Sequence, residues 1–340
     1  MKKKIIFRAD GNTTTGLGHL YRLFAIVEMI KDQYEYIYLT QSSTTTEVIP
    51  EDYAVKLIDK DIELINEPHW ISSQFRPEEY IIIADGYHFK TDYQKALKKH
   101  GFTLIYIDDL EAYHMYADAV VNHSSSAKKT DFIAEAYTRF ALGTDYALLR
   151  PKFLKTAKLT REIKQMDTAF VCFGGADKYN FSLKTAKVLL EIDQIKQVNI
   201  VLGAAYKNDE ILELEKYFSN RLRIYRNLSE KDLLDLMLSC NFAVAPTSTI
   251  LYELSCVKMP IVSGYFVDNQ ISVYNWFKAQ GCFYGIDDFI SFNFEDLRSI
   301  FKKLNDKKMQ EKQIRNQSKC IDGNQRERFL KLIATFASGL

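Results

Sequence analysis

Short apolar runs alternate along the chain with segments in which apolar residues recur every three or four positions. The runs are rich in Ile, Val and Tyr and end in polar or turn residues, a pattern typical of buried strands. In the first half they predict strands at residues 4–9, 36–40, 54–58, 80–85, 103–108 and 117–122. Between the first two strands, one face of an amphipathic helix is formed by Leu20, Leu23, Phe24, Val27 and Ile30. Strands separated by helices pair in parallel through right-handed crossovers.

The same pattern restarts in the second half. It predicts strands at residues 168–173, 197–202, 222–225, 242–245 and 260–264. The helical segments between and after them are 182–191, 209–218, 231–238, 250–256, 271–279, 306–319 and 329–336. The basic stretch 152–165 predicts a surface linker or a helix between the two halves.

A chain of 340 residues fits two domains, at roughly 150 residues for each. We therefore expect an α/β protein of two Rossmann-like, doubly wound parallel-sheet domains that face a cleft. The N-terminal domain is predicted over 1–155 and the C-terminal domain, with the terminal helices, over 156–340. Ligands of such folds bind beyond the carboxyl ends of the strands.

Charge and cysteine content exclude several classes of protein. The 45 Lys and Arg against 44 Asp and Glu leave a net charge of +1, which argues against nucleic acid as a partner. Five cysteines without a CxxC motif or a Cys/His cluster argue against a disulfide framework or a structural zinc site. No apolar run is long enough to span a membrane, and the N-terminal apolar run is too short for export. We expect a cytoplasmic protein that is monomeric or weakly associated.

A glycine-containing loop follows the first predicted strand and its polar residues Arg8 and Asp10. Glycines at 16 and 18 allow close approach of backbone to a ligand, and the helix that follows offers its positive N-terminal end to an anion. The first turn of that helix carries His19 and Arg22. His19 can act there as a general base or a donor at neutral pH. A glycine-rich turn with a capping histidine is the alternative interpretation.

Carboxylates also follow two neighbouring strands of the first half. Asp85 and Tyr87 close the strand at 80–85, and Asp108 and Asp109 close the next one. These carboxylates can position sugar hydroxyls or tune His19. They can equally cap helices, a role that Asp favours.

Three segments of the second half place hydrogen-bonding groups after strands. Gly174 and Gly175 offer backbone N–H groups that suit a diphosphate, although a tight strand–helix turn competes as an explanation. Ser248 and Thr249 begin a helix, where hydroxyls and the helix terminus together can bind phosphate. Glu253 lies one helical turn further and can hold a ribose diol, or be a solvated carboxylate.

The remaining polar motifs are less informative. The strand-end residues that can reach a sugar are Asp268, Asn269 and Gln270. Residues 322–328 predict a turn with solvated charges. The histidines without ligand spacing, interpreted as structural or surface residues, are His69, His100, His114 and His123, whereas the role of His88 stays open.

Taken together, the motifs resemble those of the UDP-sugar hydrolases of pseudaminic acid biosynthesis and of the related spore-coat polysaccharide family. The segments that carry the resemblance are 7–10, 16–22, 107–110, 142–153, 173–177, 268–270 and 322–323. They follow the family's order over nearly the entire chain. The resemblance implies an inverting glycosyltransferase fold of the B type, in which the sugar is transferred to water.

The resemblance implies hydrolysis of UDP-2,4-diacetamido-2,4,6-trideoxy-β-L-altropyranose to UDP and the free sugar, without a metal or other cofactor. The counterpart of His19 activates the water that attacks the anomeric carbon, with inversion. The diphosphate is assigned to Gly174, Gly175, Ser248 and Thr249, and the ribose to Glu253. Tyr87 and residues 268–270 line the sugar side. Substrate contacts are also expected from Arg8, Asp10, Gly16, Gly18, Arg22 and Asp85.

Two positions depart from the family pattern. Pro246 stands in a turn that is usually glycine-rich, and Gln325 replaces the second glycine of an Asp-Gly-x-Gly motif. A related 2,4-diacetamido sugar therefore stays open as the substrate. Two other functions also stay open: a UDP-sugar-dependent inverting glycosyltransferase of the same fold, and a non-catalytic module that binds nucleotide sugars.

Overall fold

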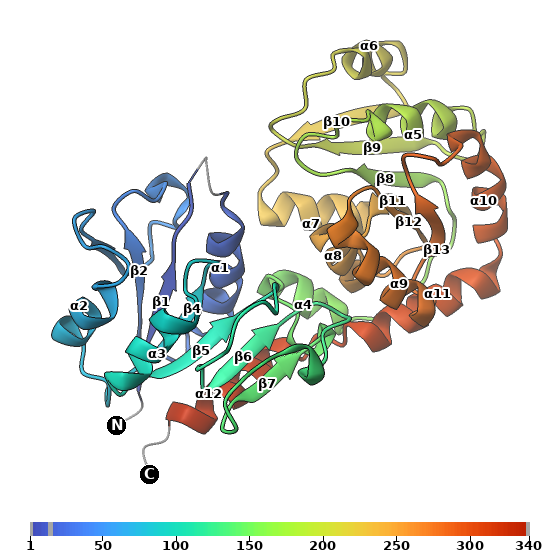
Figure 1. Cartoon of the computed structure of the whole chain (residues 1–340). Helices are drawn as coiled ribbons and strands as arrows, with labels where there is room; N and C mark the ends of the chain where they lie inside the picture. Colours follow the sequence, from blue (N-terminus) through green and yellow to red (C-terminus); the bar gives the residue numbers. More distant parts are fainter. Residues whose placement is uncertain (1–2, 13–15, 338–340) are drawn as a thin grey trace. The chain divides into compact units, whose positions relative to one another are not determined.

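The computed structural model describes residues 3–12 and 16–337, so Thr13–Thr15 of the predicted glycine-containing loop lie outside the described residues. The chain divides into two compact units (Figure 1). Unit 1 comprises Met1–Pro151 together with Asn324–Leu340, and unit 2 comprises Lys152–Gly323. Each unit contains one parallel β-sheet with helices on both faces, and each is described by itself below.

The sheet of unit 1 has seven parallel strands in the order β3-β2-β1-β4-β5-β6-β7. Their bounds are β1 (Lys4–Ala9), β2 (Tyr36–Gln41), β3 (Val55–Ile58), β4 (Tyr80–Asp85), β5 (Thr103–Ile107), β6 (Ala119–Asn122) and β7 (Arg139–Leu142). The chain builds the sheet outward from β1 in one direction and then restarts beside β1 with β4. Such a reversal opens a crevice at the carboxyl ends of the two central strands, where doubly wound folds bind ligands.

Helices cover both faces of this sheet because the buried strands are apolar on both sides. The helices of unit 1 are α1 (Gly18–Ile30), α2 (Glu67–Gln74), α3 (Thr91–Lys99) and α12 (Gln325–Ala337). α1 and α12 pack together, and α2 and α3 pack together against the core face that contains Ile6 and Ile82. An ion pair between Arg326 of α12 and Asp32 adds to the first contact.

The sheet of unit 2 has six parallel strands in the order β10-β9-β8-β11-β12-β13. Their bounds are β8 (Thr168–Cys172), β9 (Gln197–Leu202), β10 (Leu222–Arg226), β11 (Phe242–Pro246), β12 (Ile261–Tyr265) and β13 (Tyr284–Asp288). The order again reverses, here between β8 and β11. The second crevice therefore lies at the carboxyl ends of these two strands.

Unit 2 is more helical than unit 1. Its helices are α4 (Pro151–Ala157, which starts at the unit boundary), α5 (Phe181–Leu190), α6 (Glu210–Tyr217), α7 (Glu230–Ser239), α8 (Thr249–Val257), α9 (Ile271–Gln280), α10 (Leu297–Leu304) and α11 (Lys307–Cys320). Residues of α5, α6 and α10 pack with the strands in one apolar cluster. α8 contacts both α7 and α11.

The two parallel-sheet α/β domains expected from the sequence are present, and each predicted strand lies within two residues of its predicted bounds. The edge strands β7 and β13 are not predicted, since Arg139, Gly285 and the acidic end of β13 interrupt the apolar pattern. Edge strands tolerate such residues because only one side is paired.

The division of the chain differs from the expected one. The first boundary lies at Pro151, four residues before the predicted end at 155. The last helix, expected in the C-terminal domain, belongs instead to unit 1. Its apolar residues Phe329, Leu332 and Ile333 are buried there, and α12 packs against α1. Burial of this apolar stripe explains why the chain returns to the first sheet.

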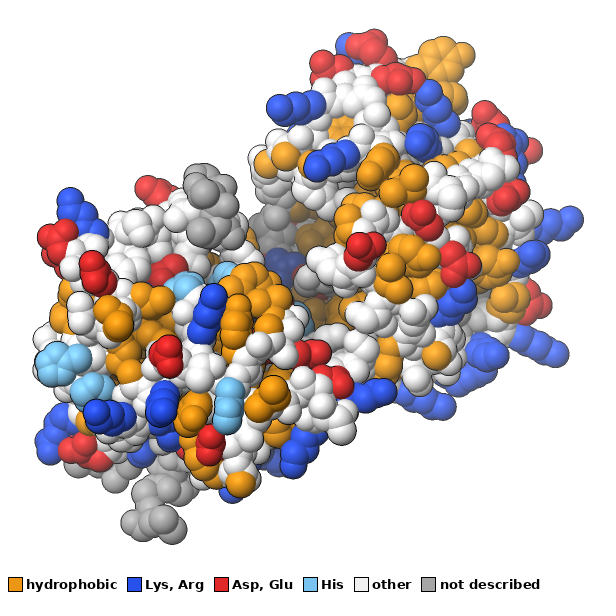
Figure 2. All heavy atoms as spheres, viewed as in Figure 1, with side chains coloured by type: hydrophobic (Ala, Val, Ile, Leu, Met, Phe, Trp, Pro, Cys, Tyr) orange, Lys and Arg blue, Asp and Glu red, His pale blue; other side chains and the backbone are white. Residues whose placement is uncertain are grey.

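Charges of both signs are interspersed on the face drawn in Figure 2. Over the described residues, no helix is both long enough and apolar enough to cross a bilayer. The five cysteines are buried, free thiols.

Candidate active site

The switch point of unit 1 joins a histidine to a buried carboxylate. His19 lies in the first turn of α1 after β1, and Asp85 is the last residue of the adjacent strand β4. His19 Nδ1 is 2.7 Å from Asp85 Oδ1. The Asp85 side chain is fully buried, whereas His19 keeps 13% of its side-chain surface exposed. The imidazole thus contacts a buried carboxylate while part of its own surface stays accessible to solvent.

Arg22 contacts both members of this pair. It lies one turn after His19 on the same face of α1, and its Nε and Nη2 donate to the two Asp85 oxygens at 2.8 and 2.7 Å. His19 Nδ1 lies 2.7 Å from both Asp85 Oδ1 and Arg22 Nη2. The carboxylate favours a hydrogen on Nδ1, whereas the guanidinium, which can only donate, favours a lone pair there. With the hydrogen on Nδ1, the second ring nitrogen, Nε2, carries the lone pair that can take a proton.

Arg22 also binds a second carboxylate, because its Nη1 donates to Asp109 Oδ2. Although burial disfavours the charged guanidinium, Asp85 and Asp109 raise the pKa of Arg22 above its ordinary value. Tyr87 completes the group. Its hydroxyl donates to Asp109 Oδ2 at 3.3 Å, and its ring meets the His19 ring edge to face at 4.5 Å. Side chains from α1, from the end of β4 and the turn after it, and from the loop after β5 thus converge on one edge of the sheet.

Arg8 and Asp10 are both predicted to contact substrate. They form part of a hydrogen-bond network at the carboxyl end of β1. Arg8 is fully buried and donates to both oxygens of Glu67, at 2.7 and 2.8 Å, and to Asp10 at 2.5 Å. Asp10 also accepts from the backbone of Gln41 at 2.7 Å and lies 3.1 Å from His88 Nε2. The prediction of a direct ligand contact for Arg8 is therefore corrected: its guanidinium is enclosed and paired.

The glycines at the start of α1 are placed as the sequence predicts. Gly16 is exposed with φ +85°, a conformation that favours glycine, and Gly18 is the exposed first residue of the helix. Leu17 occupies the N-cap and provides no side-chain hydrogen bond. No Cβ atom at either glycine would meet a described atom within 4 Å.

Glu67 and His123 also belong to this site, although the sequence predicts neither as a ligand, whereas Asp109 is predicted as one of the strand-end carboxylates. His123 follows β6 at the same edge, where burial and the charge of Arg22 lower its pKa to about 4. In the sequence, the feature of His123 that indicates a site residue is its position directly after a predicted strand. Glu67 comes from α2 and carries no comparable signal. The carboxylates of Asp85 and Asp109 serve Arg22 and His19 and do not cap helices.

In unit 2, the turn after β8 contains the predicted glycine pair. Gly174 has φ +82°, and both Gly174 and Gly175 are exposed. Gly203, after the neighbouring strand β9, packs directly against the Gly175 backbone. Asp177, which precedes α5, accepts hydrogen bonds from the backbone of Phe181 and Ser182, each at 2.8 Å, and so caps the start of the helix. The Asp177 carboxylate is therefore occupied, whereas the backbone of Gly174 and Gly175 is exposed.

The start of α8 lies across the switch point from the glycine turn. Ser248 is the N-cap, its side chain makes no capping hydrogen bond, and the first turn of α8 has no acidic residue. Thr249 is exposed, whereas Glu253 is buried, one turn further along the same helix. Burial raises the pKa of the Cys172 thiol, at the end of β8, to about 11. The nearby carboxylates of Glu253 and Asp177 contribute to this rise. Glu253 thus lies close to the junction of β8 and β11.

Residues 268–270 form a short 3-10 helix after β12. Asp268 and Asn269 are exposed, but Gln270 is buried and its Oε1 accepts from the backbone of Phe266 at 3.1 Å. Thr247 ties this loop to the end of β11, because its hydroxyl lies 3.2 Å from the carbonyls of Gly264 and Gln270. The structure brings the three predicted segments of unit 2 to adjacent strand ends.

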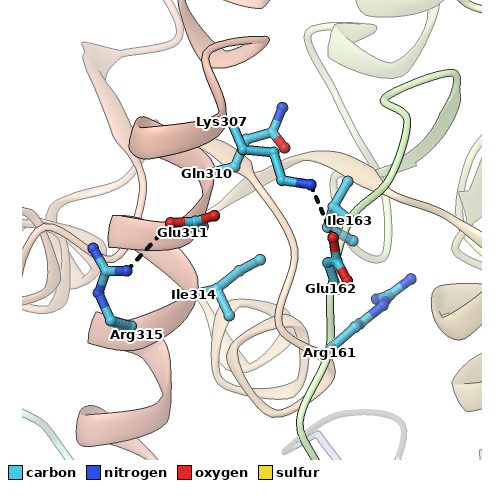
Figure 3. Close-up of a pocket in the computed structure, with 8 residues that line it drawn as sticks. All are labelled: Arg161, Glu162, Ile163, Lys307, Gln310, Glu311, Ile314 and Arg315. Carbon is cyan, nitrogen blue, oxygen red and sulfur yellow. Dashed lines mark hydrogen bonds and ion pairs between the residues drawn. The ribbon is translucent and has the colours of Figure 1, made fainter.

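A separate pocket of unit 2, with a volume of about 180 Å³, contains none of the predicted site residues (Figure 3). Two of its charged pairs are satisfied, Lys307 with Glu162 at 3.0 Å and Arg315 with Glu311 at 3.5 Å. Over the described part of the chain, no group of three His, Cys, Asp or Glu residues is arranged to hold a metal ion.

Solved structures with this architecture share little sequence with the chain. MurG of Acinetobacter baumannii has a TM-score of 0.66 at 14% identity, over 98% of this chain and 99% of that one. Alr3699/HepE of Anabaena, solved in complex with UDP, has a TM-score of 0.63 at 13% identity, over 98% and 100%. The fold is that of B-type glycosyltransferases. At these identities the likeness concerns the fold alone.

Sequence relatives point in the same direction as the motifs. The chain is 26% identical over 82% of its length to the UDP-2,4-diacetamido-2,4,6-trideoxy-β-L-altropyranose hydrolase of Campylobacter jejuni, of which it covers 97%. It is 21% identical over 80% of its length to the spore coat polysaccharide biosynthesis protein SpsG of Bacillus subtilis, and covers 80% of that protein. No protein-family model matches. The chain is thus a distant relative of both proteins.

The B-type fold accommodates the two departures noted in the sequence. Pro246 ends β11, opposite Gly264 of β12, so that the turn toward Ser248 starts from a buried residue without an N–H group. Gln325 is fully buried in unit 1 and its Nε2 donates to the carbonyl of Thr144 at 3.0 Å. In this chain Gln325 therefore anchors the start of α12.

Proposed function

We propose that the chain hydrolyses a UDP-linked 2,4-diacetamido-2,4,6-trideoxy sugar, UDP-2,4-diacetamido-2,4,6-trideoxy-β-L-altropyranose, to UDP and the free sugar with inversion. The oxygen of a water molecule attacks the anomeric carbon and His19 Nε2 takes the water proton. The bond between the anomeric carbon and the β-phosphate oxygen breaks, and UDP leaves with the bonding electrons. The product belongs to the biosynthesis of nonulosonic acids such as pseudaminic acid.

The observation that carries this proposal is the contact of 2.7 Å between His19 Nδ1 and Asp85 Oδ1. A buried carboxylate that orients an imidazole and stabilises its protonated form is the arrangement that general-base catalysis requires. Arg22 donates hydrogen bonds to both oxygens of that carboxylate. The sequence relationship to the Campylobacter jejuni hydrolase supports water as the acceptor.

Unit 2 supplies the proposed ligands of UDP. The exposed Gly174 and Gly175 and the uncapped start of α8 at Ser248 and Thr249 lie at adjacent strand ends. Backbone N–H groups and hydroxyls at a helix start suit a diphosphate and stabilise the charge that grows on departing UDP. Glu253 is the proposed ligand of the ribose, and Asp268 and Asn269 of the sugar.

The first experiment follows the UDP-sugar by phosphorus and proton NMR without an added acceptor. Release of UDP and the opposite anomer of the free sugar is the expected result. In water enriched in oxygen-18, the label enters the sugar and not the phosphate, because the proposed reaction breaks the carbon–oxygen bond. Label in the nucleotide phosphate contradicts the proposed mechanism.

The second experiment tests whether His19 acts in catalysis and not in nucleotide binding. His19→Ala is expected to lower kcat by about 10²–10⁴-fold, with an unchanged Kd for UDP in calorimetry. The matched control is Asp32→Asn, which changes an exposed, paired carboxylate of the same unit. Equal kcat in His19→Ala and Asp32→Asn would remove His19 from the mechanism.

Turnover that appears only after addition of a sugar or lipid acceptor would instead establish a glycosyltransferase. Binding of UDP-sugars without turnover under either condition would favour a binding module. The cytoplasmic location and the monomeric or weakly associated state stay predictions.

A further inference from the structure

Two buried cysteines of unit 2 lie in direct contact. Cys282 Sγ and Cys320 Sγ are 3.3 Å apart, although 38 positions separate the two residues in the sequence. The sulfurs of a disulfide bond are about 2.05 Å apart, so a small approach of the two side chains is enough to join them. In the described part of the chain, none of the other three thiols, Cys172, Cys240 and Cys256, contacts a second sulfur.

The backbone segments that carry the two thiols are held together by side chains of α11 (Figure 1). Asn316 Nδ2 donates to the carbonyl of Gly281 at 3.1 Å, and Gln317 Nε2 donates to the carbonyl of Cys282 at 2.8 Å. Gly281 follows α9 with φ +70°, and a Cβ atom there would lie 2.9 Å from Asn316 Nδ2. Gln317 precedes Cys320 by three positions, which places both on the same face of α11. The contact between the thiols therefore follows from the packing of α11 against the turn after α9.

The two thiols differ in accessibility and in acidity. Cys320 is the last residue of α11 and keeps 7% of its surface exposed, whereas Cys282 is fully buried. The hydrogen bond from the Cys282 thiol lowers the pKa of Cys320 against the opposing effect of burial, and the charge of Lys319 also lowers it. The same hydrogen bond raises the pKa of Cys282. Because the thiolate is the nucleophile in oxidation, these features make Cys320 the thiol that reacts first.

The other three cysteines lack such an environment. Burial raises the pKa of Cys172 and of Cys240 to about 11, and it also raises the pKa of Cys256. Buried thiols of this kind stay protonated and are inert. Oxidation of the folded chain should therefore concentrate on Cys282 and Cys320.

We propose that Cys282 and Cys320 are a site of reversible oxidation, at which hydrogen peroxide converts the two thiols into an intramolecular disulfide. The Cys320 thiolate attacks one peroxide oxygen and the oxygen–oxygen bond breaks. Cys320 becomes a sulfenic acid, and the departing hydroxide takes up the proton that the thiol released, as water. The Cys282 sulfur then attacks Cys320 Sγ, the sulfur–oxygen bond breaks, and a second water leaves with the Cys282 proton. Two thiols are thus oxidised by two electrons, and one peroxide is reduced to two waters.

The disulfide would clamp the last part of unit 2. It closes a loop that contains β13, α10 and most of α11, and closing a loop of this length stabilises the folded state by restricting the unfolded chain. Cys282 lies before β13, at the amino end of a parallel strand, whereas the proposed UDP ligands follow the carboxyl ends of strands. We therefore expect oxidation to raise the stability of unit 2 and to leave UDP binding unchanged. In a reducing compartment such a disulfide is transient and thiols reverse it.

The test treats the folded, full-length chain with hydrogen peroxide and then counts its free thiols. Catalase removes the peroxide, the chain is unfolded and alkylated with N-ethylmaleimide, and the intact protein and its peptides are analysed by mass spectrometry. We expect alkylation of Cys172, Cys240 and Cys256 alone, and a crosslinked peptide pair that joins Cys282 to Cys320. The Tm of the oxidised protein should rise by about 5–15 °C, with an unchanged Kd for UDP. Dithiothreitol should restore all five thiols and the original Tm.

Single substitutions test the order of the two steps. In Cys282→Ala the sulfenic acid of Cys320 has no thiol to react with, so dimedone should label it. In Cys320→Ala we expect no dimedone label on Cys282. The matched control is Cys240→Ala, which removes a buried thiol outside the pair. This control should form the disulfide and show the same rise in Tm as the unsubstituted chain.

Five free thiols after peroxide treatment, or a crosslink that involves any other cysteine, would overturn the proposed oxidation site. A dimedone label on Cys282 in Cys320→Ala would contradict the assignment of Cys320 as the first thiol to react. A disulfide that leaves Tm unchanged would contradict its role as a clamp. The thiol count uses the unsubstituted chain, so it decides the matter even where a variant does not fold. None of these measurements requires turnover, so their outcome is independent of the proposed hydrolysis.

Discussion

Gly203 lies so close to Gly175 that a Cβ atom built on Gly203 would be 2.3 Å from the Gly175 Cα atom. The first glycine follows β9 and the second follows β8, so two neighbouring strand ends of unit 2 meet through bare backbone. Gly175 itself has open space where its own Cβ atom would point. Gly203 therefore packs against the backbone of the turn, while Gly175 faces the solvent.

Gly203→Ala should displace the glycine turn after β8. The added methyl group has no room, and overpacking of this kind costs about 1–3 kcal/mol of unfolding free energy. We expect a lower Tm and a Kd for UDP raised at least tenfold, measured by thermal denaturation and calorimetry.

The matched control is Gly175→Ala, whose methyl group enters open space. Its unfolding free energy should stay within about 0.5 kcal/mol of the wild type. If the turn binds the diphosphate, the methyl group nevertheless weakens UDP. Normal UDP affinity in both variants would show that the glycine turn does not contact the nucleotide.

Glu67→Gln should destabilise unit 1 strongly. Arg8 and Glu67 are both fully buried and form a two-point contact, and Tyr93 also donates to Glu67 at 2.5 Å. Removing one charge of a buried pair costs about 3–5 kcal/mol, because the other charge remains buried. Chemical denaturation measures the loss.

Asp32→Asn provides the comparison, since its ion pair with Arg326 is exposed. Exposed pairs contribute about 0–1 kcal/mol. Equal losses of unfolding free energy in the two variants would mean that the Arg8–Glu67 pair contributes no more than a surface contact.

Local periodicity predicts the position of Asp85 well. The apolar run at 80–85 indicates a strand, and parallel topology then places its carboxyl end beside the end of β1. The spacing of three between His19 and Arg22 puts both side chains on one face of α1. The sequence therefore predicts that these groups lie at one edge of a sheet.

The partners of these groups are harder to predict, because they depend on packing between distant segments. Glu67 lies 59 positions from Arg8 and comes from a helix on the opposite face of the sheet from α1. The return of α12 to unit 1 depends on a match between two apolar surfaces, which no local motif encodes. Likewise, only the structure shows that Asp109 has one satisfied and one orphaned oxygen.

His123 should make the stability of unit 1 sensitive to mild acid. Burial and the Arg22 charge lower its pKa to about 4 in the folded chain, from an ordinary value near 6.5. Above about pH 6.5 both states are neutral. Between about pH 6.5 and 4 only the unfolded state gains the proton, so the unfolding free energy falls by about 2–3 kcal/mol as the pH is lowered.

His123→Gln should flatten this part of the stability curve, as measured by denaturation at a series of pH values. His69→Gln, at an exposed position, should leave the slope as in the wild type. The same slope in all three proteins between pH 6.5 and 4 would show that His123 is not held in its neutral form.

Asp85→Asn should remove the orientation of the proposed base while preserving the shape of the site. An asparagine can turn its oxygen or its amide nitrogen toward His19 Nδ1. When the nitrogen is presented, the imidazole holds its hydrogen on Nε2 and cannot accept a proton from water. Loss of the correct tautomer in a comparable triad lowers kcat by about 10⁴-fold, and we expect a loss of about 10²–10⁴-fold here. The Kd of UDP should not change, because the proposed nucleotide ligands belong to unit 2. Full activity of Asp85→Asn would show that the Asp85 carboxylate is not needed to orient His19. This result would contradict the assignment of the base.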